Sequence, residues 1–413
     1  MAESAWRRYR RAYEGLPREA WILAGINLIN AAGTMVVFFL TLYLTRELGF
    51  PAARAGRAVG AFGLGMLFGT ILGGKLADRL GTRAVQKGSL VVSGVLLIVL
   101  GLARGPAALF ALVFLSGVSS AALFPANVAA MAEICGPLDR GRGFVLNRLA
   151  SNLGSTVAPV AGGLLARLDY RLLFWGDGLT CLVAAFAFFL FLPGDGKRPG
   201  RVESKDAAPA AVRWKSDGVL RRLLLGSFGS TLIFGQLYGA FPIFLRTTYG
   251  LPESAIGLAI AVNPLLIVLA QMAVTKRVER LPLARVAAAG TAFLAAGYAL
   301  LPLGSGLAAA VLATLVWTAG EMLYMPTQLN MISFRAPEGA QGTYQGLNSL
   351  AFGLGIVAGP ALGTQILQSV GPTALWLGVG VIGLIVAAFY WRLDKRMAPP
   401  SVAGDGTRNV GTG

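Results

Sequence analysis

Residues 73–83, GGKLADRLGTR, place the acid Asp78 among three bases between two long apolar segments. The preceding segment, 54–74, carries a row of glycines, and small residues of this kind let helix backbones approach closely inside a bilayer. A second apolar run, 85–103, follows. We therefore predict that residues 73–83 form a short charged hinge between two membrane-spanning helices.

The hinge pattern Gly-x-Leu-Ala-Asp-Arg-x-Gly-x-Arg resembles the signature between the second and third helices of the major facilitator superfamily. The resemblance implies a conformational switch whose acid contacts the start of the eleventh helix only when the cytoplasmic side is closed. The alternative is an ordinary cytoplasmic turn whose bases only follow membrane topology. The switch residues are Gly74, Asp78, Arg79, Gly81 and Arg83.

The composition of the 413 residues is typical of an integral membrane protein, because 55% are hydrophobic and only 13% are charged. Histidine is absent, and the two cysteines are expected to be reduced and structural. Without histidine or paired carboxylates in the apolar segments, the sequence predicts neither an enzyme nor a metal site, and it predicts no cofactor. Proton chemistry is left to carboxylates.

The net charge of +17 is distributed unevenly across the expected membrane. If the N-terminus is cytoplasmic, seven Lys and Arg residues fall on the far side and the other 29 face the cytoplasm, as the positive-inside rule requires. The bases then face anionic membrane lipids and not nucleic acid. We expect a monomer in the cell inner membrane with both termini cytoplasmic. The seven are Arg46, Arg54, Arg57, Arg104, Arg167, Arg171 and Arg246.

The chain offers about twelve segments of the ~20 mostly apolar residues that a spanning helix needs. The expected fold is therefore all-α integral membrane, with six-helix halves at 1–192 and 221–396, a cytoplasmic linker at 193–220 and a disordered tail at 397–413. The predicted spans are 20–45, 54–74, 85–103, 107–134, 143–166, 172–192, 221–246, 255–275, 286–303, 307–333, 343–369 and 372–392.

A repeat at a constant offset of 201 residues relates the two halves. Glycine, proline and polar positions match without an insertion, which chance similarity among Leu and Ala would not produce. We therefore predict two pseudo-symmetric halves as parallel repeats, with a substrate cavity at their interface. Matching pairs include Gly49 with Gly250, Gly56 with Gly257, Asn147 with Asn348 and Pro159 with Pro360.

The fifth segment resembles the antiporter motif of drug/proton exchangers. Ala158 replaces the usual glycine, whereas the second-half copy at 355–363 keeps it. Helix packing alone is the alternative to an antiport role. The motif residues are Gly154, Pro159, Gly162 and Gly163.

The tenth segment contains WTAGEMLYMPTQ, residues 317–328, which is similar to a run in the same helix of proton-coupled exporters of lipophilic cations. Glu321 lies near the bilayer midplane, where an ionised side chain costs about 2.5–3.5 kcal/mol. We expect Glu321 to bind protons and substrate, with Tyr324 and Gln328 on the same helix face as further substrate contacts. The alternative is a structural Glu that is hydrogen-bonded to a neighbouring helix.

Polar residues of other segments are candidates to line the same cavity. An interhelical hydrogen bond is the alternative role for each of them. Asn147 stands where the resembling exporters have an acid, which removes a second proton site and puts the preference for cations in doubt. The further substrate-binding candidates are Asn27, Asn30, Thr34, Asn147, Gln236, Tyr238 and Asn263.

Glu133 closes the fourth segment and matches an acid near the cytoplasmic mouth of the resembling exporters. The resemblance implies that Glu133 joins Asp78 and Glu321 in proton coupling, and a solvated helix-end acid is the alternative. Asp177 begins the sixth segment and receives no role.

These features favour a proton-coupled secondary transporter that exports amphiphilic or lipophilic small molecules by alternating access, which is a multidrug efflux function. An exporter or flippase of a specific lysolipid, siderophore or other metabolite is the alternative, because one fold hosts many substrates. An ATP-driven pump would need a G-x-x-x-x-G-K-[ST] loop, and no such string occurs. A channel would leave the repeat and the hinge unexplained.

Asp78→Asn should shift the population toward the conformation that is open to the cytoplasm. The substitution removes an acid that the resemblance places at the N-terminal end of the eleventh helix, where the helix dipole favours negative charge. Distances between spin labels on the cytoplasmic side of the two halves should lengthen, and unchanged distances would contradict the switch.

Overall fold

A computed structural model describes residues 14–192, 194, 217–337 and 340–393. This part of the chain is built from helices, most of them joined by short connections. Within these residues there is no strand, so the all-α class predicted from composition is confirmed. The predicted linker at 193–220 lies mostly outside the described residues, and the predicted tail at 397–413 lies wholly outside them.

Eleven helices are long and apolar enough to cross a membrane, and a bent pair, Gly218–Tyr238 with Ala240–Thr247, supplies a twelfth span, as predicted. The first half contains α2 (Arg18–Gly33), α3 (Val36–Leu42), η1 (Tyr43–Glu47), α4 (Ala52–Leu80), α5 (Thr82–Leu102), α6 (Pro106–Leu168) and α7 (Arg171–Phe191). The second half contains α8 (Gly218–Phe234), η3 (Gly235–Tyr238), α9 (Ala240–Thr247), α10 (Glu253–Val278), α11 (Leu283–Ala299), η4 (Leu301–Leu303), α12 (Gly306–Arg335), α13 (Gln341–Ser369) and α14 (Pro372–Leu393).

The non-helical part of the hinge is shorter than predicted. Because α4 continues to Leu80 and α5 begins at Thr82, most of residues 73–83 is helical and not a connecting segment. Gly81 alone reverses the chain with a φ of 90°, a conformation open to glycine and rarely adopted by residues with a Cβ. Gly136, with a φ of 65°, separates the fourth and fifth spans within α6 in the same way.

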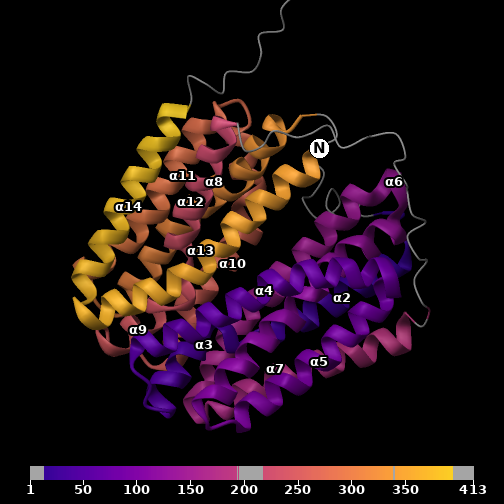
Figure 1. Cartoon of the computed structure of the whole chain (residues 1–413), viewed down its shortest axis with the longest axis horizontal. Coiled ribbons are helices and arrows are strands. Elements are labelled where there is room, and N and C mark those ends of the chain that lie inside the picture. The colour runs from indigo at the N-terminus through magenta and orange to yellow at the C-terminus, as the bar shows by residue number, and fades with distance from the viewer. Residues whose placement is uncertain (1–13, 193, 195–216, 338–339, 394–413) are drawn as a thin grey trace, which may run out of the picture.

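The two halves lie against each other at one end of the molecule (Figure 1). Their ribbons meet near α3 and α9 and separate toward the opposite ends of the helices. We name the end that carries the start of α10 the closed end, and the end that carries Gly81 the hinge end. The structure is therefore one state of a two-part molecule, with the halves apart at the hinge end.

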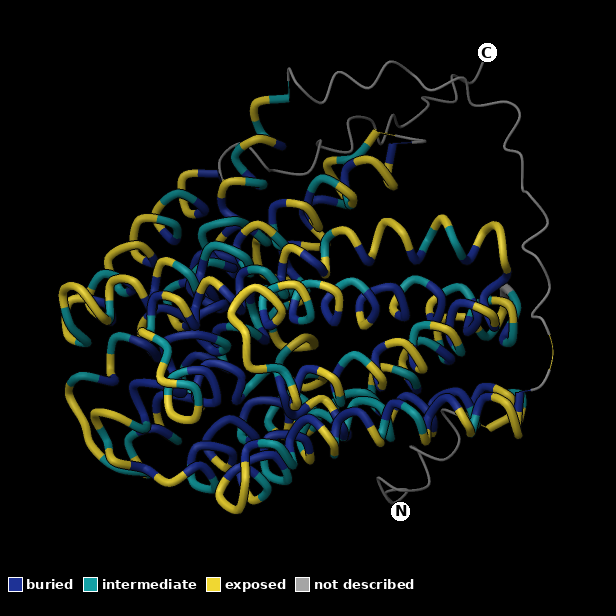
Figure 2. The backbone as a smooth tube through the Cα atoms, turned by 60° about the horizontal axis from the view of Figure 1, so that its bottom comes forward, coloured by how far each residue is buried: buried dark blue, intermediate teal, exposed yellow. Residues whose placement is uncertain are grey.

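Exposed residues follow the outward faces of the helices, whereas buried residues gather where helices pack together (Figure 2). Many exposed side chains are large and apolar, among them Phe68, Leu179 and Leu384. Soluble monomers rarely expose so much contiguous apolar surface. These faces are suited to contact with lipid.

Glycines at equivalent positions of the repeat bring the halves together. A Cβ on Gly257 of α10 would overlap the carbonyl oxygen of Pro159 in α6, and a Cβ on Gly56 of α4 would overlap that of Pro360 in α13. Because both the glycines and the prolines are matched pairs of the repeat, the interface has pseudo-twofold symmetry.

Asp217 ties together three helices of the second half at the hinge end. It caps α8 by accepting hydrogen bonds of 3.0 Å from the N–H groups of Val219 and Leu220. Its other partners are Arg335 at the end of α12, at 2.9 Å, and the hydroxyl of Tyr344 in α13, at 3.0 Å. Burial opposes ionisation of Asp217, but these hydrogen bonds outweigh it and hold the pKa of the carboxyl below its ordinary value.

Gly257→Ala should destabilise the contact between the halves, because the new methyl group meets backbone atoms that cannot rotate away. Overpacking of this kind costs about 1–3 kcal/mol, so the purified variant should melt below the wild type. Gly378→Ala is the matched control, because a Cβ at Gly378 has no neighbour within 4 Å. Equal melting temperatures for the two variants would contradict the close contact.

Candidate functional site

Glu321 lies midway along α12 and is hydrogen-bonded to the neighbouring helix α10. The side-chain amide of Asn263 donates to Oε2 of Glu321 at 2.6 Å and to the hydroxyl of Thr318 at 3.1 Å. The positive charge of Arg148, on α6 of the opposite half, also acts on Glu321. Arg148 itself is exposed and forms no ion pair with another described residue. The acid is thus held by its own half and is influenced by a cation of the other.

A cluster of aromatic rings that includes Tyr238 lies beside Glu321. Tyr238 is close enough for its hydroxyl to be affected by the charge of Glu321, and it stacks on Phe38 of the first half with ring centroids 5.7 Å apart. Trp317, one turn from Glu321, makes an edge contact with Phe234 at 6.2 Å. A carboxylate beside aromatic faces is a combination that suits lipophilic cations.

Tyr324 and Gln328, which were predicted to share the exposed face of Glu321, are packed into the second half in this conformation. Gln328 accepts a hydrogen bond of 2.9 Å from the hydroxyl of Tyr390 and donates one of 3.0 Å to the carbonyl of Leu223. The ring of Tyr324 lies against that of Tyr390. The reason is that α8 and α14 cover this part of α12. A substrate contact by these two residues stays a prediction.

Gln236 is likewise occupied by its own half. Its side-chain amide donates to the carbonyls of Leu232 and Gly359 at 3.1 and 2.9 Å, next to the break between α8 and α9. This arrangement joins the seventh span to α13. Its role in substrate binding is untested.

Asn27 and Asn147 belong to a chain of side-chain amides inside the first half. Gln86 of α5 donates to Asn127 of α6 at 2.7 Å, Asn127 donates to Asn27 of α2 at 2.7 Å, and Asn27 donates to Asn147 in the fifth span. These bonds satisfy polar groups that a bilayer would leave without partners. The sequence showed these amides singly, but their connection depends on the packing of three helices.

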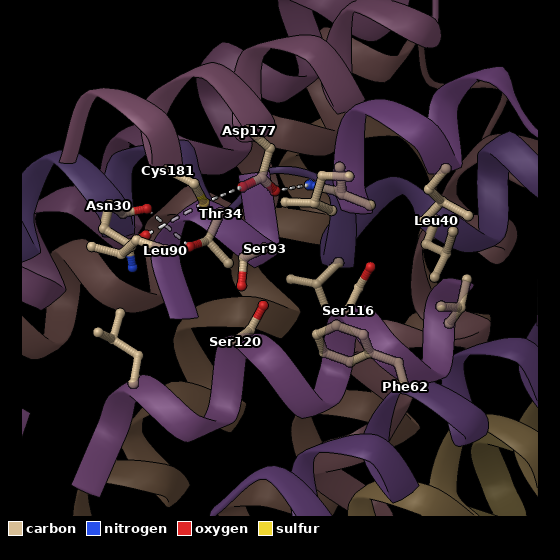
Figure 3. Close-up of a pocket in the computed structure, with 16 residues that line it drawn as sticks. Asn30, Thr34, Leu40, Phe62, Leu90, Ser93, Ser116, Ser120, Asp177 and Cys181 are labelled. Carbon is tan, nitrogen blue, oxygen red and sulfur yellow. Dashed lines mark hydrogen bonds between the residues drawn. The ribbon is translucent and has the colours of Figure 1, made fainter. Parts of the chain in front are cut away.

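Asn30 and Thr34 line a small pocket between α2, α3, α4, α5, α6 and α7 (Figure 3). Asp177 lies at the same pocket and is buried. Sequence analysis assigned Asp177 no role, although an acid seven residues into an apolar span is a signal of function.

The hinge residues divide into a buried and an exposed set. Arg83 is buried, and its charge attracts Glu133, which also accepts a hydrogen bond of 3.2 Å from Thr82. Asp78 is exposed and forms no hydrogen bond or ion pair with another described residue. The predicted contact of Asp78 with the eleventh helix is absent here because the halves are apart at the hinge end.

The antiporter-motif residues lie where helices pack closely. Gly154 and Gly162 leave no room for a Cβ against α2 and α3 of their own half. A Cβ on Gly163 would overlap the backbone of Glu253 in the opposite half. Close packing accounts for these glycines, and an antiport-specific role remains a prediction.

Glu253 at the closed end joins the halves by polar contacts that sequence analysis missed. It accepts a hydrogen bond of 2.8 Å from the hydroxyl of Tyr170 in the first half and lies 3.3 Å from the guanidinium of Arg246 in its own. Burial, followed by the bond to Glu253, raises the pKa of Tyr170, so its phenol stays protonated and donates. No pattern around Glu253 in the sequence marks this pairing.

No group of three His, Cys, Asp or Glu side chains suited to a metal ion occurs among the described residues. Twelve spans in two repeated halves, with a hydrogen-bonded acid at mid-span beside their interface, define a multi-pass membrane transporter. The model of the Major Facilitator Superfamily matches residues 22–356 and 223–411. The chain therefore belongs to this superfamily.

Named relatives and solved structures agree with the family. The multidrug resistance protein MdtH of Aeromonas hydrophila subsp. hydrophila is 25% identical over 373 residues, which cover 88% of this chain and 92% of that protein. The uncharacterized MFS-type transporter YttB of Bacillus subtilis (strain 168) is 27% identical over 406 residues, covering 92% and 96%. The crystal structure of a POT family transporter in complex with 5-aminolevulinic acid has a TM-score of 0.79 at 16% identity, covering 94% and 98%. The nucleoside transporter NupG has a TM-score of 0.77 at 14% identity, covering 91% and 99%.

Glu253→Gln should weaken the closed end, because the neutral amide loses the attraction to Arg246 and accepts a weaker bond from Tyr170. The population should move toward conformations in which the closed end is apart. Spin labels at Leu168 and Leu303, both exposed at this end, would report longer distances.

Glu47→Gln is the matched control for this measurement. Glu47 is exposed at the same end and forms no bond with another described residue. If both variants leave the label distances at their wild-type values, the contacts of Glu253 do not hold the halves together.

Proposed function

We propose that this protein is a proton-driven exporter of amphiphilic, preferentially cationic, small molecules. The observation that carries the proposal is Glu321, an acid at mid-span that is hydrogen-bonded to Asn263 and lies beside the aromatic interface between the halves. An ionisable group at this depth is costly, and in transporters such groups commonly serve ions and substrates.

The distribution of charge orients the protein in the membrane. Among the described residues, most Lys and Arg lie at the hinge end, and the positive-inside rule places such an end in the cytoplasm. With this orientation the halves are apart on the cytoplasmic side, which suits the step at which cargo enters. The proposed location is the cytoplasmic membrane, with both termini inside.

The proposed cycle follows from competition for one carboxylate. In the inward-facing state Glu321 releases its proton to the cytoplasm and attracts a cationic cargo. In the outward-facing state a proton from outside neutralises Glu321, which removes the attraction and releases the cargo. By thermodynamic linkage, proton and cargo each disfavour the binding of the other by the same free energy.

The names of two relatives support a role in drug export. MdtH of Aeromonas hydrophila subsp. hydrophila is called a multidrug resistance protein, and relatives of the same name occur in Yersinia pestis. At 23–25% identity the substrate class is not transferred by similarity. The proposed substrate class therefore rests on the chemistry of the residues around Glu321.

Glu321→Gln should abolish proton-driven export of a cationic dye such as ethidium, because the amide cannot alternate between charged and neutral forms. Export is measured by fluorescence in liposomes with an imposed pH gradient and equal amounts of protein. Glu321→Asp keeps the carboxyl and should retain part of the activity. Glu279→Gln, which removes an exposed acid at the hinge end, is the matched control and should export as the wild type does.

Dye export by Glu321→Gln at the wild-type rate would remove Glu321 from the mechanism and leave it a structural hydrogen-bonding role. If the wild type carries protons only with neutral metabolites or lysolipids, the cationic substrate class is wrong while proton coupling stands. A wild type that moves no protons with any cargo would overturn the coupling itself.

A further inference from the structure

Asp177 of α7 holds the break in the first membrane span. Its Oδ2 accepts hydrogen bonds of 3.1 Å from the backbone N–H groups of Met35 and Val36, where α2 has ended and α3 begins. The N–H of Met35 also lies 2.6 Å from the carbonyl oxygen of Gly33, whereas the carboxyl is the acceptor that satisfies the N–H of Val36 at the start of α3. The hydrogen-bonding strength of Asp177 therefore affects the conformation of the break.

The second half builds the equivalent break without an acid. The seventh span is interrupted between α8 and α9, and the side chain of Gln236 supports it by donating to the carbonyl of Gly359. The repeat places Gly378 at the position equivalent to Asp177. A broken span at this point of the fold therefore does not require a carboxyl, and Asp177 contributes more than backbone shape.

The surroundings of Asp177 contain no cation to balance its charge. Among the residues that line the pocket, Cys181 is the only other titratable side chain, with Sγ 3.9 Å from Oδ1 of Asp177 and 3.6 Å from Oδ1 of Asn30. Asp177 is only 5% exposed. The remaining polar groups of the pocket, contributed by α2, α5 and α6, are neutral: Asn30, Thr34, Ser93, Ser116 and Ser120 (Figure 3).

The pocket beside Asp177 has an exposed residue in its lining. Thr34 lines the pocket and is exposed, and Asn30, one turn earlier on the same helix, is half-buried. The hydroxyl of Thr34 donates to the backbone carbonyl of Asn30, and the side-chain oxygen of Asn30 lies beside the thiol of Cys181, which lies beside Asp177 (Figure 3). Most of the lining is apolar, and the oxygen atoms of Asn30, Thr34 and the three serines form the polar part of the pocket around the acid.

We propose that Asp177 is a second proton-binding residue of this transporter and that its protonation loosens the break in the first span. A proton from water forms an O–H bond with Oδ1, which faces the pocket, and the carboxyl becomes neutral. A neutral carboxyl accepts hydrogen bonds less strongly than a carboxylate, so Met35 and Val36 are held less firmly. The link between this proton and transport rests on the proposed function, whereas binding of the proton does not.

Contacts between the two breaks carry the change to the other half. Phe38 of α3 stacks on Tyr238, and the hydroxyl of Thr41 donates to the carbonyl of Gly239 at 3.3 Å. Tyr238 in turn lies beside Glu321. Protonation of Asp177 in one half thus acts on the surroundings of Glu321 in the other.

Hydrogen exchange of the full-length protein in nanodiscs tests the proposal. After correction for the intrinsic effect of pH, the amides of residues 33–42 should exchange faster in acid than in alkaline buffer. Residues 372–393 of α14, which take no part in the contacts between the two breaks, are the internal control and should show no such difference. Equal responses of the two segments in the wild type would overturn the proposal without any variant.

Asp177→Asn separates the proton from the hydrogen bonds, because its amide oxygen still accepts from Met35 and Val36. This variant should fold, lose the pH response of residues 33–42 and lack a protonated-carboxyl band that the wild type shows in acid-minus-alkaline infrared difference spectra. Glu321→Gln should keep both signals. A pH response and a band that persist in Asp177→Asn would refute the assignment.

The two proposals fail separately. If Glu321→Gln abolishes dye export while residues 33–42 do not respond to pH, the second proton site is wrong and the proposed function stands. If residues 33–42 respond and the wild type exports no cationic dye, the proton site stands and the proposed function falls.

Discussion

The bilayer supplies no hydrogen bonds, and this constraint governs how the chain departs from regular helix. An unpaired N–H or C=O group in hydrocarbon costs several kcal/mol, so each break within a span needs a protein partner. In the first span the partner of the break is Asp177. In the seventh span the side chain of Gln236 links the break to α13. Because the breaks touch each other through Phe38 and Tyr238, the irregular parts of the two halves meet at their interface.

The repeat provides symmetry for packing and leaves the polar chemistry different in the two halves. Gly49 and Gly250 share a φ of 66°, and the glycines at 56 and 257 face equivalent prolines. The backbone turns and the close contacts between helices are therefore repeated in the two halves. The buried acids do not follow it, because the positions equivalent to Asp177 and Glu321 are glycine and serine, Gly378 and Ser120. Two similar scaffolds can thus carry different functional groups.

Much of the candidate site was within reach of the sequence. An acid in the middle of an apolar helix is rare enough to identify Glu321, and Asn263 was among the polar candidates that the structure places in contact with it. Asp177 was as visible in the apolar sixth span, but no motif gave it a role. Glu253 at the start of the eighth span had no such signal, because an acid beside a loop is ordinary. Its importance depends on Tyr170, which is distant in the chain.

The sequence by itself determined the number of spans, their order, the two-half repeat and the presence of an acid at mid-span. The spans and the acid within one of them are local features, since hydrophobic length is set by neighbouring residues, and the repeat can be recognised by comparing the two halves of the sequence. Tertiary structure alone decided which polar groups face one another. Helical spacing put Tyr324 and Gln328 on the face of Glu321, but packing by α8 and α14 directed them into their own half. A helix has neighbours on several sides. Which helix covers each side depends on the packing of the whole bundle, so the sequence of one segment cannot predict it.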